Sequence, residues 1–330
     1  MSFMENAVAI IGPQSSVIAH VVSYLAKRLQ VPLLSFAATD PSLSSPEYPF
    51  FVRTTQNDVF QMAVIADIVV YFGWRKVTAI YKDDDFGRNG IAALEDKLAG
   101  KQCTISYKAP MNPEPSGEDI RQILYQLWPK GASAGSFSTM LDSGYVWIAT
   151  DWLTDILETD SPLSSSSLSD VQGLLTLRFH TPESKLKKQV MTRWRNLIRR
   201  EYTDGLFGLN TYGLHAYDTV WILAHALNEY FSQGGSISFS NTSMIRQFKD
   251  SNLHLDAMRV FDGGELLLSN YDSDRDLINP SYDIVNVVGT GHINIGYWIN
   301  SSGLSVQPPE ALFSTPLNQT GFRQQLYSVI

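Results

Sequence analysis

Short apolar runs alternate with helix-like segments through the first half of the chain, and this alternation limits the possible folds more than any other feature. Ala7–Ile11 is a continuous apolar run, as in a strand buried on both faces, and a polar turn at 12–16 leads into helix-like periodicity from Val17 to Leu29. Val31–Ser35 and Phe50–Arg53 are the next apolar runs. This order is typical of parallel βαβ units.

The same pattern continues to residue 127. Asn57 or Asp58 can cap a helix that runs to Tyr71, and Gly73 follows at its C-terminal end. The later elements are a strand at 77–81, a helix ending at Leu98, a strand at 104–108 and a helix ending at Leu127. Right-handed units of this kind predict an α/β fold with doubly wound sheets.

Beyond residue 128 the pattern is less regular. The segment 128–144 shows neither helical nor strand periodicity, although a strand is expected there. Strands are predicted at 145–149 and 174–179. Two long helices, 181–202 and 211–231, each carry an apolar stripe that predicts a core face. The stripes are Leu186, Val190, Trp194, Leu197 and Ile198 on the first helix, and Leu214, Tyr217, Trp221 and Ala224 on the second. Short strands are predicted at 258–261, 282–288 and 293–298.

The composition is that of a globular protein of two core-forming domains. The chain has 330 residues, of which 44% are hydrophobic, and a formal net charge of -8. The acidic balance disfavours a nucleic-acid partner. The longest apolar stretch, 63–72, contains Asp67 and is far shorter than the ~20 residues that a membrane-spanning helix needs. The first residues have no basic segment followed by an apolar one, so no signal peptide is predicted.

Two motifs suggest chemistry but lack the necessary context. Gly131–Gly135 matches the Gly-x-Ser-x-Gly turn of serine hydrolases, yet Trp128-Pro129-Lys130 precedes it instead of an apolar strand, which favours a flexible loop. Four aspartates have the spacing of calcium ligands in an EF-hand loop, but Leu277 stands where glycine is needed, which favours a solvated acidic turn. These aspartates are Asp272, Asp274, Asp276 and Asp283. The six histidines and the single Cys103 show no metal-ligand spacing, and we predict no metal, cofactor or enzymatic activity.

The remaining candidate for a site is a pair of loops, 12–16 and 37–41, that follow predicted strands. Ligands of doubly wound sheets bind at the carboxyl ends of strands, where hydroxyls and the amides of a helix N-terminus can hold a carboxylate. The basic face of helix 185–200 is predicted to be solvated, with a partner-binding face as the alternative. Three glycosylation sequons begin at Asn241, Asn300 and Asn318, and they matter only if the chain is secreted.

These loops and the segments after them resemble one family, the extracellular amino-terminal domain of plant glutamate receptor-like channels. The resemblance covers nearly the whole chain, and the segments follow in the family's order. They are Ala9–Ser16, Val31–Pro41, Phe51–Asp58, Asp84–Gly90, Gly144–Trp152, Ala216–Trp221, Leu277–Ile284, Ile295–Trp298, Gly303–Val306 and Pro308–Glu310.

The resemblance implies a fold similar to type I periplasmic binding proteins, with two α/β lobes joined by crossovers that close on a small amino-acid-type ligand. Lobe 1 would comprise 1–55 and 181–270, lobe 2 would comprise 56–180 and 271–305, and 306–330 would be a C-terminal tail. By analogy, Ser15, Ser16, Ala37, Ala38 and Thr39 would hold the ligand's carboxylate and amino groups. Asp58, Phe86 and Asp151 would face it from the hinge and lobe 2. The family often has tyrosine at the Phe86 position, so a hydroxyl is missing there.

The chain also departs from the family pattern, and we expect both lobes to be incomplete. The family has a further strand, helix and strand before Ala7, a strand–helix unit near 128–144, and another strand near Leu268-Ser269-Asn270. We also expect this chain to lack the agonist-binding domain and the pore helices of the parent channels. Those channels lie in the plasma membrane with this domain outside. Two hypotheses follow: the chain binds an amino-acid-type ligand, or it only associates with other glutamate receptor-like subunits through lobe-1 helices.

Overall fold

The computed structural model describes residues 7–29, 31–127, 145–158, 171–201, 208–232, 234, 276–277, 279–289 and 291–312. The predictions for 131–135 and 258–261 lie outside these residues. The chain divides into two compact units. Unit 1 contains the described parts of 1–57, 181–205 and 209–280, and unit 2 contains those of 58–180, 206–208 and 281–330.

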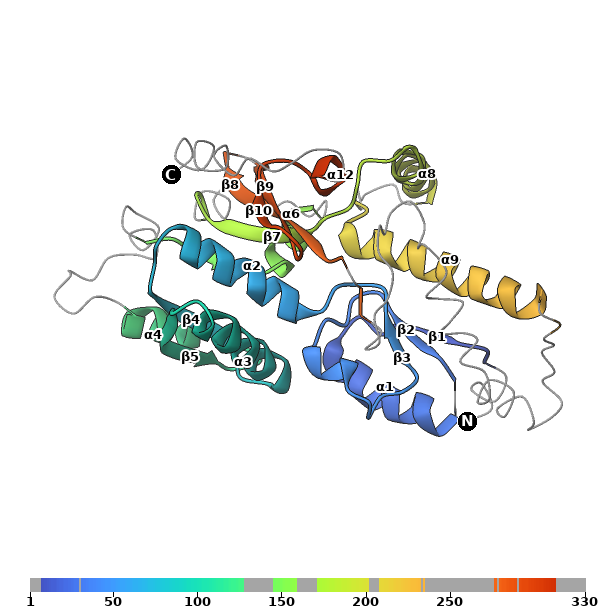
Figure 1. Ribbon diagram of the computed structural model, residues 1–330, viewed down its shortest axis with the longest axis horizontal. Helices are drawn as coiled ribbons and strands as arrows, with labels where there is room; N and C mark the ends of the chain where they lie inside the picture. Colours follow the sequence, from blue (N-terminus) through green and yellow to red (C-terminus); the bar gives the residue numbers. More distant parts are fainter. Residues whose placement is uncertain are drawn as a thin grey trace. The chain divides into compact units, whose positions relative to one another are not determined.

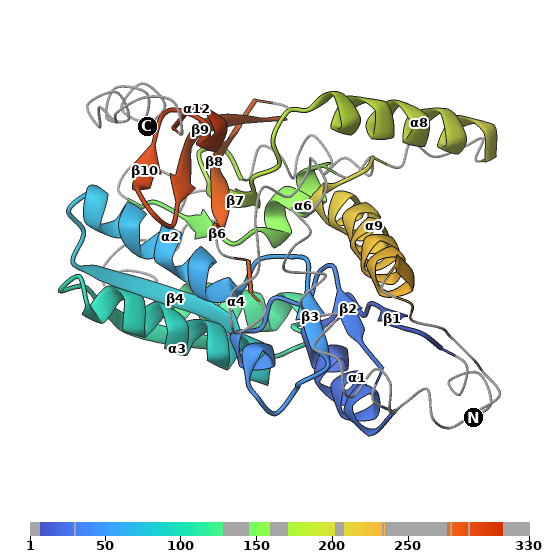
Figure 2. The same cartoon turned by 45° about the vertical axis from the view of Figure 1, so that its right-hand side comes forward.

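Unit 1 is built on a parallel sheet with a helix on each face. Its strands are β1 (Ile10–Ile11), β2 (Leu33–Ser35) and β3 (Phe51–Arg53), in that spatial order. Ile10 is in register with Leu33, and Leu34 with Val52. The helices α1 (Ser16–Leu29) and α9 (Thr211–Ser232) lie on opposite sides of this sheet (Figures 1 and 2). The predicted βαβ order and α/β class are confirmed.

Alternate residues of β2 and β3 are buried in separate hydrophobic cores on the two faces of the sheet. This burial explains why both strands are largely apolar. Leu33 and Phe51 pack with Ala19 and Ala26 of α1. On the opposite face, the core consists of Leu34, Val52, Ile222, Ala226 and Leu277. A strand covered on both faces buries every side chain, so it loses the alternation of polar and apolar residues.

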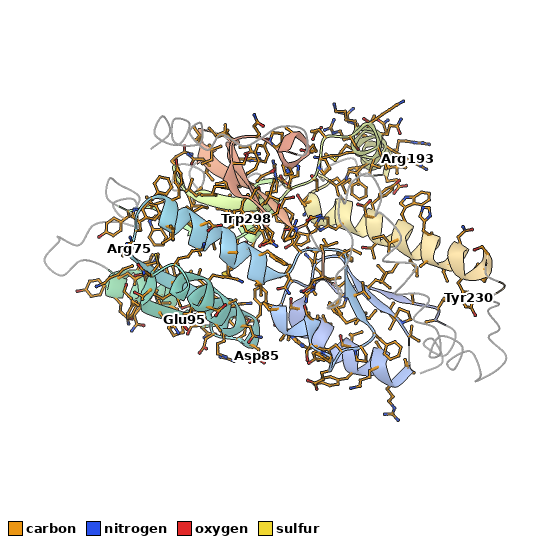
Figure 3. All side chains as sticks on the ribbon, in the orientation of Figure 1. Arg75, Asp85, Glu95, Arg193, Tyr230 and Trp298 are labelled. Carbon is orange, nitrogen blue, oxygen red and sulfur yellow. The ribbon has the colours of Figure 1, made fainter. Side chains whose placement is uncertain are left out.

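The predicted core faces of the two long helices are only partly correct. In α9, Leu214 is buried, but Trp221 is 47% exposed. The buried face instead runs through Asp218, Ile222 and Ala226, because this face meets β2 and β3. In α8 (Lys185–Glu201) no side chain is fully buried, and basic residues such as Arg193 occupy a wide solvated face (Figure 3). The basic residues of α8 are exposed as predicted, which agrees both with a solvated face and with the alternative of a partner-binding face.

Unit 2 contains two sheets among the described residues. The strands β4 (Lys76–Lys82) and β5 (Thr104–Met111) pair in parallel, with α3 (Asp85–Ala99) and α4 (Gly117–Leu127) packed on them. The second sheet has the order β10-β9-β8-β7-β6, in which only β6 and β7 are parallel. Its strands are β6 (Ile148–Ala149), β7 (Leu175–Phe179), β8 (Ser281–Val288), β9 (Gly291–Ile299) and β10 (Gly303–Ser305). Four short elements were not predicted: β10, η1 (Pro41–Ser44), α6 (Trp152–Glu158) and α12 (Pro309–Leu312).

The most apolar stretch of the sequence is the buried helix α2 (Asp58–Tyr71). It packs against α3 and β10, so it buries Val64, Ile68 and other apolar residues on several faces (Figure 1). Asp67 accepts a hydrogen bond from Trp298 Nε1 at 2.6 Å and forms an ion pair with Lys101 at 2.7 Å. Within the described part of the chain, no helix has both the length and the apolarity needed to cross a membrane.

Asp276 and Leu277 belong to unit 1, whereas residues from 271 onward were expected in lobe 2. Leu277 is in the core with Leu34 and Val52, and Asp276 forms a buried ion pair with Arg53. These contacts are long-range, so local sequence patterns do not indicate them. The chain enters unit 2 again at Ser281.

Candidate ligand-binding site

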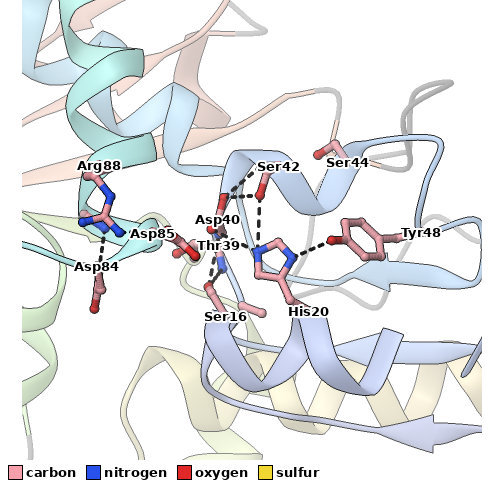
Figure 4. Close-up of polar contacts among 12 residues, drawn as sticks. Ser16, His20, Thr39, Asp40, Ser42, Ser44, Tyr48, Asp84, Asp85 and Arg88 are labelled. Atoms are coloured by element: carbon pink, nitrogen blue, oxygen red, sulfur yellow. Dashed lines mark hydrogen bonds and ion pairs between the residues drawn. The ribbon is translucent and has the colours of Figure 1, made fainter. Parts of the chain in front are cut away.

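The two loops predicted to bind the ligand lie together in unit 1. Because β1 and β2 are parallel, the loops that follow them leave the same edge of the sheet. Gly12 has φ +112°, a backbone conformation that residues other than glycine rarely adopt. Beyond it, the Oγ of Ser16 accepts hydrogen bonds from the backbone N–H of Thr39 and of Asp40, each at 3.2 Å (Figure 4). The structure therefore brings the two predicted loops into contact.

The predicted residues of these loops differ in their access to solvent. Ala37, Ala38 and Thr39 are 7%, 0% and 5% exposed. The amides of Ala37 and Ala38 donate to the Oγ of Ser35, at 3.4 and 2.9 Å. Ser15, by contrast, is exposed immediately before α1. The first turn of α1 contains no acidic residue, so its N-terminal amides and partial positive charge make this end suitable for an anion.

Arg53 supports the loop 37–41 by hydrogen bonds to its backbone. Its side chain is 1% exposed, and Nη1 donates to the carbonyl oxygens of Ala38 at 3.2 Å and Asp40 at 3.0 Å. Its Nε lies 2.8 Å from Oδ1 of Asp276. A buried guanidinium needs such acceptors because desolvating the charge is costly. Arg53 is therefore a positioning residue for the loop.

Two histidines hold the same loop from the helices on either side of the sheet. His20 of α1 lies 3.2 Å from Oδ2 of Asp40 through Nε2 and 3.1 Å from the hydroxyl of Tyr48 through Nδ1 (Figure 4). His215 of α9 is hydrogen-bonded to the backbone of Phe36, and burial lowers its pKa to about 4. The hydrogen-bond partner of His215 therefore comes from the loop after β2, which lies far from α9 in the sequence.

In unit 2, the structure brings two predicted residues, Asp58 and Asp151, together through Gln61. Nε2 of Gln61 donates to Oδ1 of Asp58 at 2.9 Å and to Oδ1 of Asp151 at 3.0 Å. Its Oε1 accepts the backbone N–H of Asp151 at 2.7 Å. One amide thus holds two carboxylates close together, and such a pair can accept hydrogen bonds from an ammonium group.

Phe86 lies in the first turn of α3 and is 37% exposed. This turn is fixed by Asp84, whose side chain accepts the backbone N–H of Gly87 at 2.8 Å. A Cβ atom at Gly87 would overlap the carbonyl oxygen of Lys82, so this position requires glycine. The contribution of Phe86 to a ligand site stays a prediction.

The other predicted positions are placed as follows. Asn300 is exposed in the turn between β9 and β10, whereas Asn241 and Asn318 lie outside the described residues. Of the four aspartates with calcium-like spacing, Asp272 and Asp274 are also outside. Asp276 and Asp283 pair with Arg53 in unit 1 and with Arg178 in unit 2, so these two do not form one solvated turn.

Sequence reasoning missed Ser35, Arg53 and Gln61. Ser35 and Arg53 are polar residues at the carboxyl ends of otherwise apolar strands, and this position could have marked them as site-supporting residues. Gln61 lies three residues after Asp58 and thus on the same face of α2. Its contact with Asp151, 90 positions later, has no local signal.

Comparison with known proteins agrees with this architecture. The family described as "Receptor family ligand binding region" matches residues 1–133 and 138–290. All of the chain aligns with 38% of "Glutamate receptor 3.1" from Oryza sativa subsp. japonica at 44% identity. It also aligns over its whole length with "Glutamate receptor 3.2" and "Glutamate receptor 3.4" from Arabidopsis thaliana, at 43% and 42% identity. The chain spans less than two fifths of the length of these relatives.

The family match covers well over half of the chain, and the parallel sheets flanked by helices agree with the type I periplasmic-binding-protein-like fold that the sequence predicted. The predicted resemblance to the amino-terminal region of plant glutamate receptors is confirmed by the relatives. The chain therefore belongs to the family of receptor ligand-binding regions.

Proposed function

We propose that this chain binds a small amino-acid-type ligand and does not catalyse a reaction. The observation that carries the proposal is the convergence of Ser15, Ser16 and the loop 37–40 at the N-terminus of α1, a place that favours a carboxylate. The paired carboxylates of Asp58 and Asp151 add the acceptors that an ammonium group requires. An amino acid carries one group that suits each of these sets, a carboxylate and an ammonium group.

The finer parts of the expected function extend this proposal. The ligand would lie between the two lobes, and the region would be the extracellular part of a ligand-gated cation channel in the plasma membrane. The names of the relatives, which call them glutamate receptors, support an amino-acid ligand. The exposed sequon at Asn300 is compatible with an extracellular position.

Isothermal titration of the chain with a panel of amino acids tests the proposal. Ser15→Asp places a carboxylate before α1 and keeps a residue that caps helices well, so it should repel the ligand without unfolding the helix. Asp151→Asn removes one charge and keeps an oxygen for Gln61. Each variant should weaken binding about tenfold or more, because Ser15→Asp adds a charge that repels the ligand's carboxylate and Asp151→Asn weakens a charge-assisted hydrogen bond.

Asp96→Asn, at an exposed position of α3, is the matched control and should leave the affinity unchanged. A folded sample that releases no heat with any amino acid would exclude the proposal. If Ser15→Asp weakens binding and Asp151→Asn does not, the acidic pair does not hold the ligand's amino group.

A second candidate function rests on the outer face of α1. Val17, Ile18, Val21 and Tyr24 of this helix are 52%, 53%, 68% and 51% exposed. An exposed apolar patch of this kind is typical of a protein–protein interface. We propose as the alternative that this face associates with other glutamate receptor-like subunits. Co-purification with a full-length relative should be lost in Val21→Glu, and capture of that variant at the wild-type level would exclude this face.

A further inference from the structure

One histidine in unit 2 lies between two carboxylates. His180 follows β7, and its Nδ1 is 2.6 Å from Oδ1 of Asp283 on β8. Its Nε2 is 3.1 Å from Oε1 of Glu310 on α12. An ionised carboxylate only accepts hydrogen bonds, and a neutral imidazole carries a single N–H. Both contacts can therefore be hydrogen bonds only when His180 carries both protons and a positive charge.

The groups around His180 favour this charged form. Arg178 donates to Oδ2 of Asp283 through Nε and Nη2, at 2.9 and 2.6 Å, and to Glu158 of α6 through Nη1 at 2.8 Å. The cluster thus contains three carboxylates (Asp283, Glu158 and Glu310) and one guanidinium, and a charged imidazole reduces its net charge from -2 to -1. Burial acts to lower the pKa of His180, but the hydrogen bonds and charges of Asp283 and Glu310 raise it overall.

Two further titratable residues of this cluster, Tyr297 and His292, lie on β9, and neither supplies the positive charge. The ring of Tyr297 meets the imidazole of His180 edge-on at 5.6 Å, and burial together with the charges of Asp283 and Glu310 raises the pKa of its hydroxyl. Burial and the charge of Arg178 lower the pKa of His292, which keeps that ring neutral near pH 7. His180 is accordingly the imidazole of this cluster that two carboxylates hold in its charged form.

The hydrogen bond between His180 and Glu310 connects the second sheet of unit 2 to the short helix α12. The helix α12 has only four residues and packs against β9. Such a short helix is marginal by itself, so its position depends on tertiary contacts. The side chain of Glu310 is 36% exposed, whereas that of His180 is 8% exposed, so the carboxylate can leave for water while the histidine stays in place.

We propose that His180 is a proton-operated latch, which holds α12 against the sheet of unit 2 when it is charged and releases α12 when it loses its proton. Above the titration point one of the two carboxylates loses its hydrogen bond. Glu310 is the one that leaves, because Asp283 is also held by Arg178. The latch is independent of the ligand site and of the proposed binding function.

Two measurements on the whole chain test the latch. The Cε1–H resonances of the six histidines, with His180 assigned by its loss in His180→Gln, give its titration point, which should lie above the ordinary value of about 6.5. Hydrogen exchange of peptide 306–312, corrected for the intrinsic effect of pH, should show about tenfold lower protection once the pH passes that point. The peptide 281–288 from β8 is the internal reference and should keep its protection.

Variants separate the latch from general pH effects. Glu310→Gln should lower the titration point of His180 and leave peptide 306–312 weakly protected at every pH. Glu183→Gln, which removes an exposed carboxylate paired with Lys187 in unit 1, should keep the full pH step. A titration point of His180 at or below about 6.5, protection that does not change with pH in the wild type, or a step that persists in Glu310→Gln would each overturn the proposal.

Discussion

Replacement of Asp218 by asparagine should stabilise unit 1 at neutral and alkaline pH. Asp218 lies on the sheet-facing side of α9 and is 1% exposed. Neither of its carboxylate oxygens has a hydrogen-bond partner among the described residues. Burial therefore raises the pKa of this carboxyl from 3.8 to about 7.

The sign and size of the effect follow from this pKa. The folded state keeps a proton that the unfolded state has already lost, so stability falls as the pH rises from about 4 to about 7 and is flat above that. About three pKa units correspond to ~4 kcal/mol of unfolding free energy. Asparagine has nearly the same shape and no titration, so it avoids this loss. The gain should be close to zero near pH 4 and amount to several kcal/mol at pH 8.

Urea unfolding followed by circular dichroism, at pH 4 and at pH 8, measures this gain. The difference between Asp218→Asn and the wild type cancels the titration of groups that the two proteins share. Asp96→Asn, exposed on α3, is the control and should change the unfolding free energy by less than about 0.5 kcal/mol at either pH.

An equal effect of Asp218→Asn at both pH values would refute the reasoning, because it would mean that the carboxyl has the same pKa in the folded and unfolded states. A loss of stability at pH 8 would refute it as well, since that result requires a partner for the charged carboxylate in the folded protein.

Three further outcomes are expected. Arg53→Gln should lower the unfolding free energy by about 3 to 5 kcal/mol in urea, because it removes the positive charge that pairs with buried Asp276, whereas Arg193→Gln on the exposed face of α8 should have little effect. Gln61→Leu removes the amide between two carboxylates and should cost about 1 to 3 kcal/mol by calorimetry. When the chain is secreted by a eukaryotic host, Asn300→Gln should lower its mass by that of one glycan. Equal glycan mass on the wild type and the variant would show that this sequon is not used.

Much of the secondary structure could be predicted because its signals are local. The run at 31–35 and the periodicity of 17–29 depend only on neighbouring residues, and β2 and α1 were found close to their predicted limits. The core face of α9 was predicted less well. This helix carries apolar residues on several sides, and only its contact with β2 and β3 determines that Ile222 is buried and Trp221 exposed.

The candidate site likewise combines features that local sequence patterns predicted with features that only tertiary contacts determine. Strand-end loops with small and hydroxyl residues pointed to 12–16 and 37–41, and the structure places these loops together. The sequence did not indicate that the amides of Ala37 and Ala38 would be bound to Ser35, nor that Gln61 would join Asp58 to Asp151.

The sequence by itself determined the α/β class, the order of most elements and the family, because these depend on local periodicity and on motifs that are contiguous in the chain. Only the tertiary structure decided which charged groups share a buried environment. Arg53 with Asp276, and His180 with Asp283 and Glu310, are separated by more than 100 positions. The charge of a buried group depends on the atoms packed around it and not on its neighbours in the chain, so these pairs and their titration exist only in the folded protein.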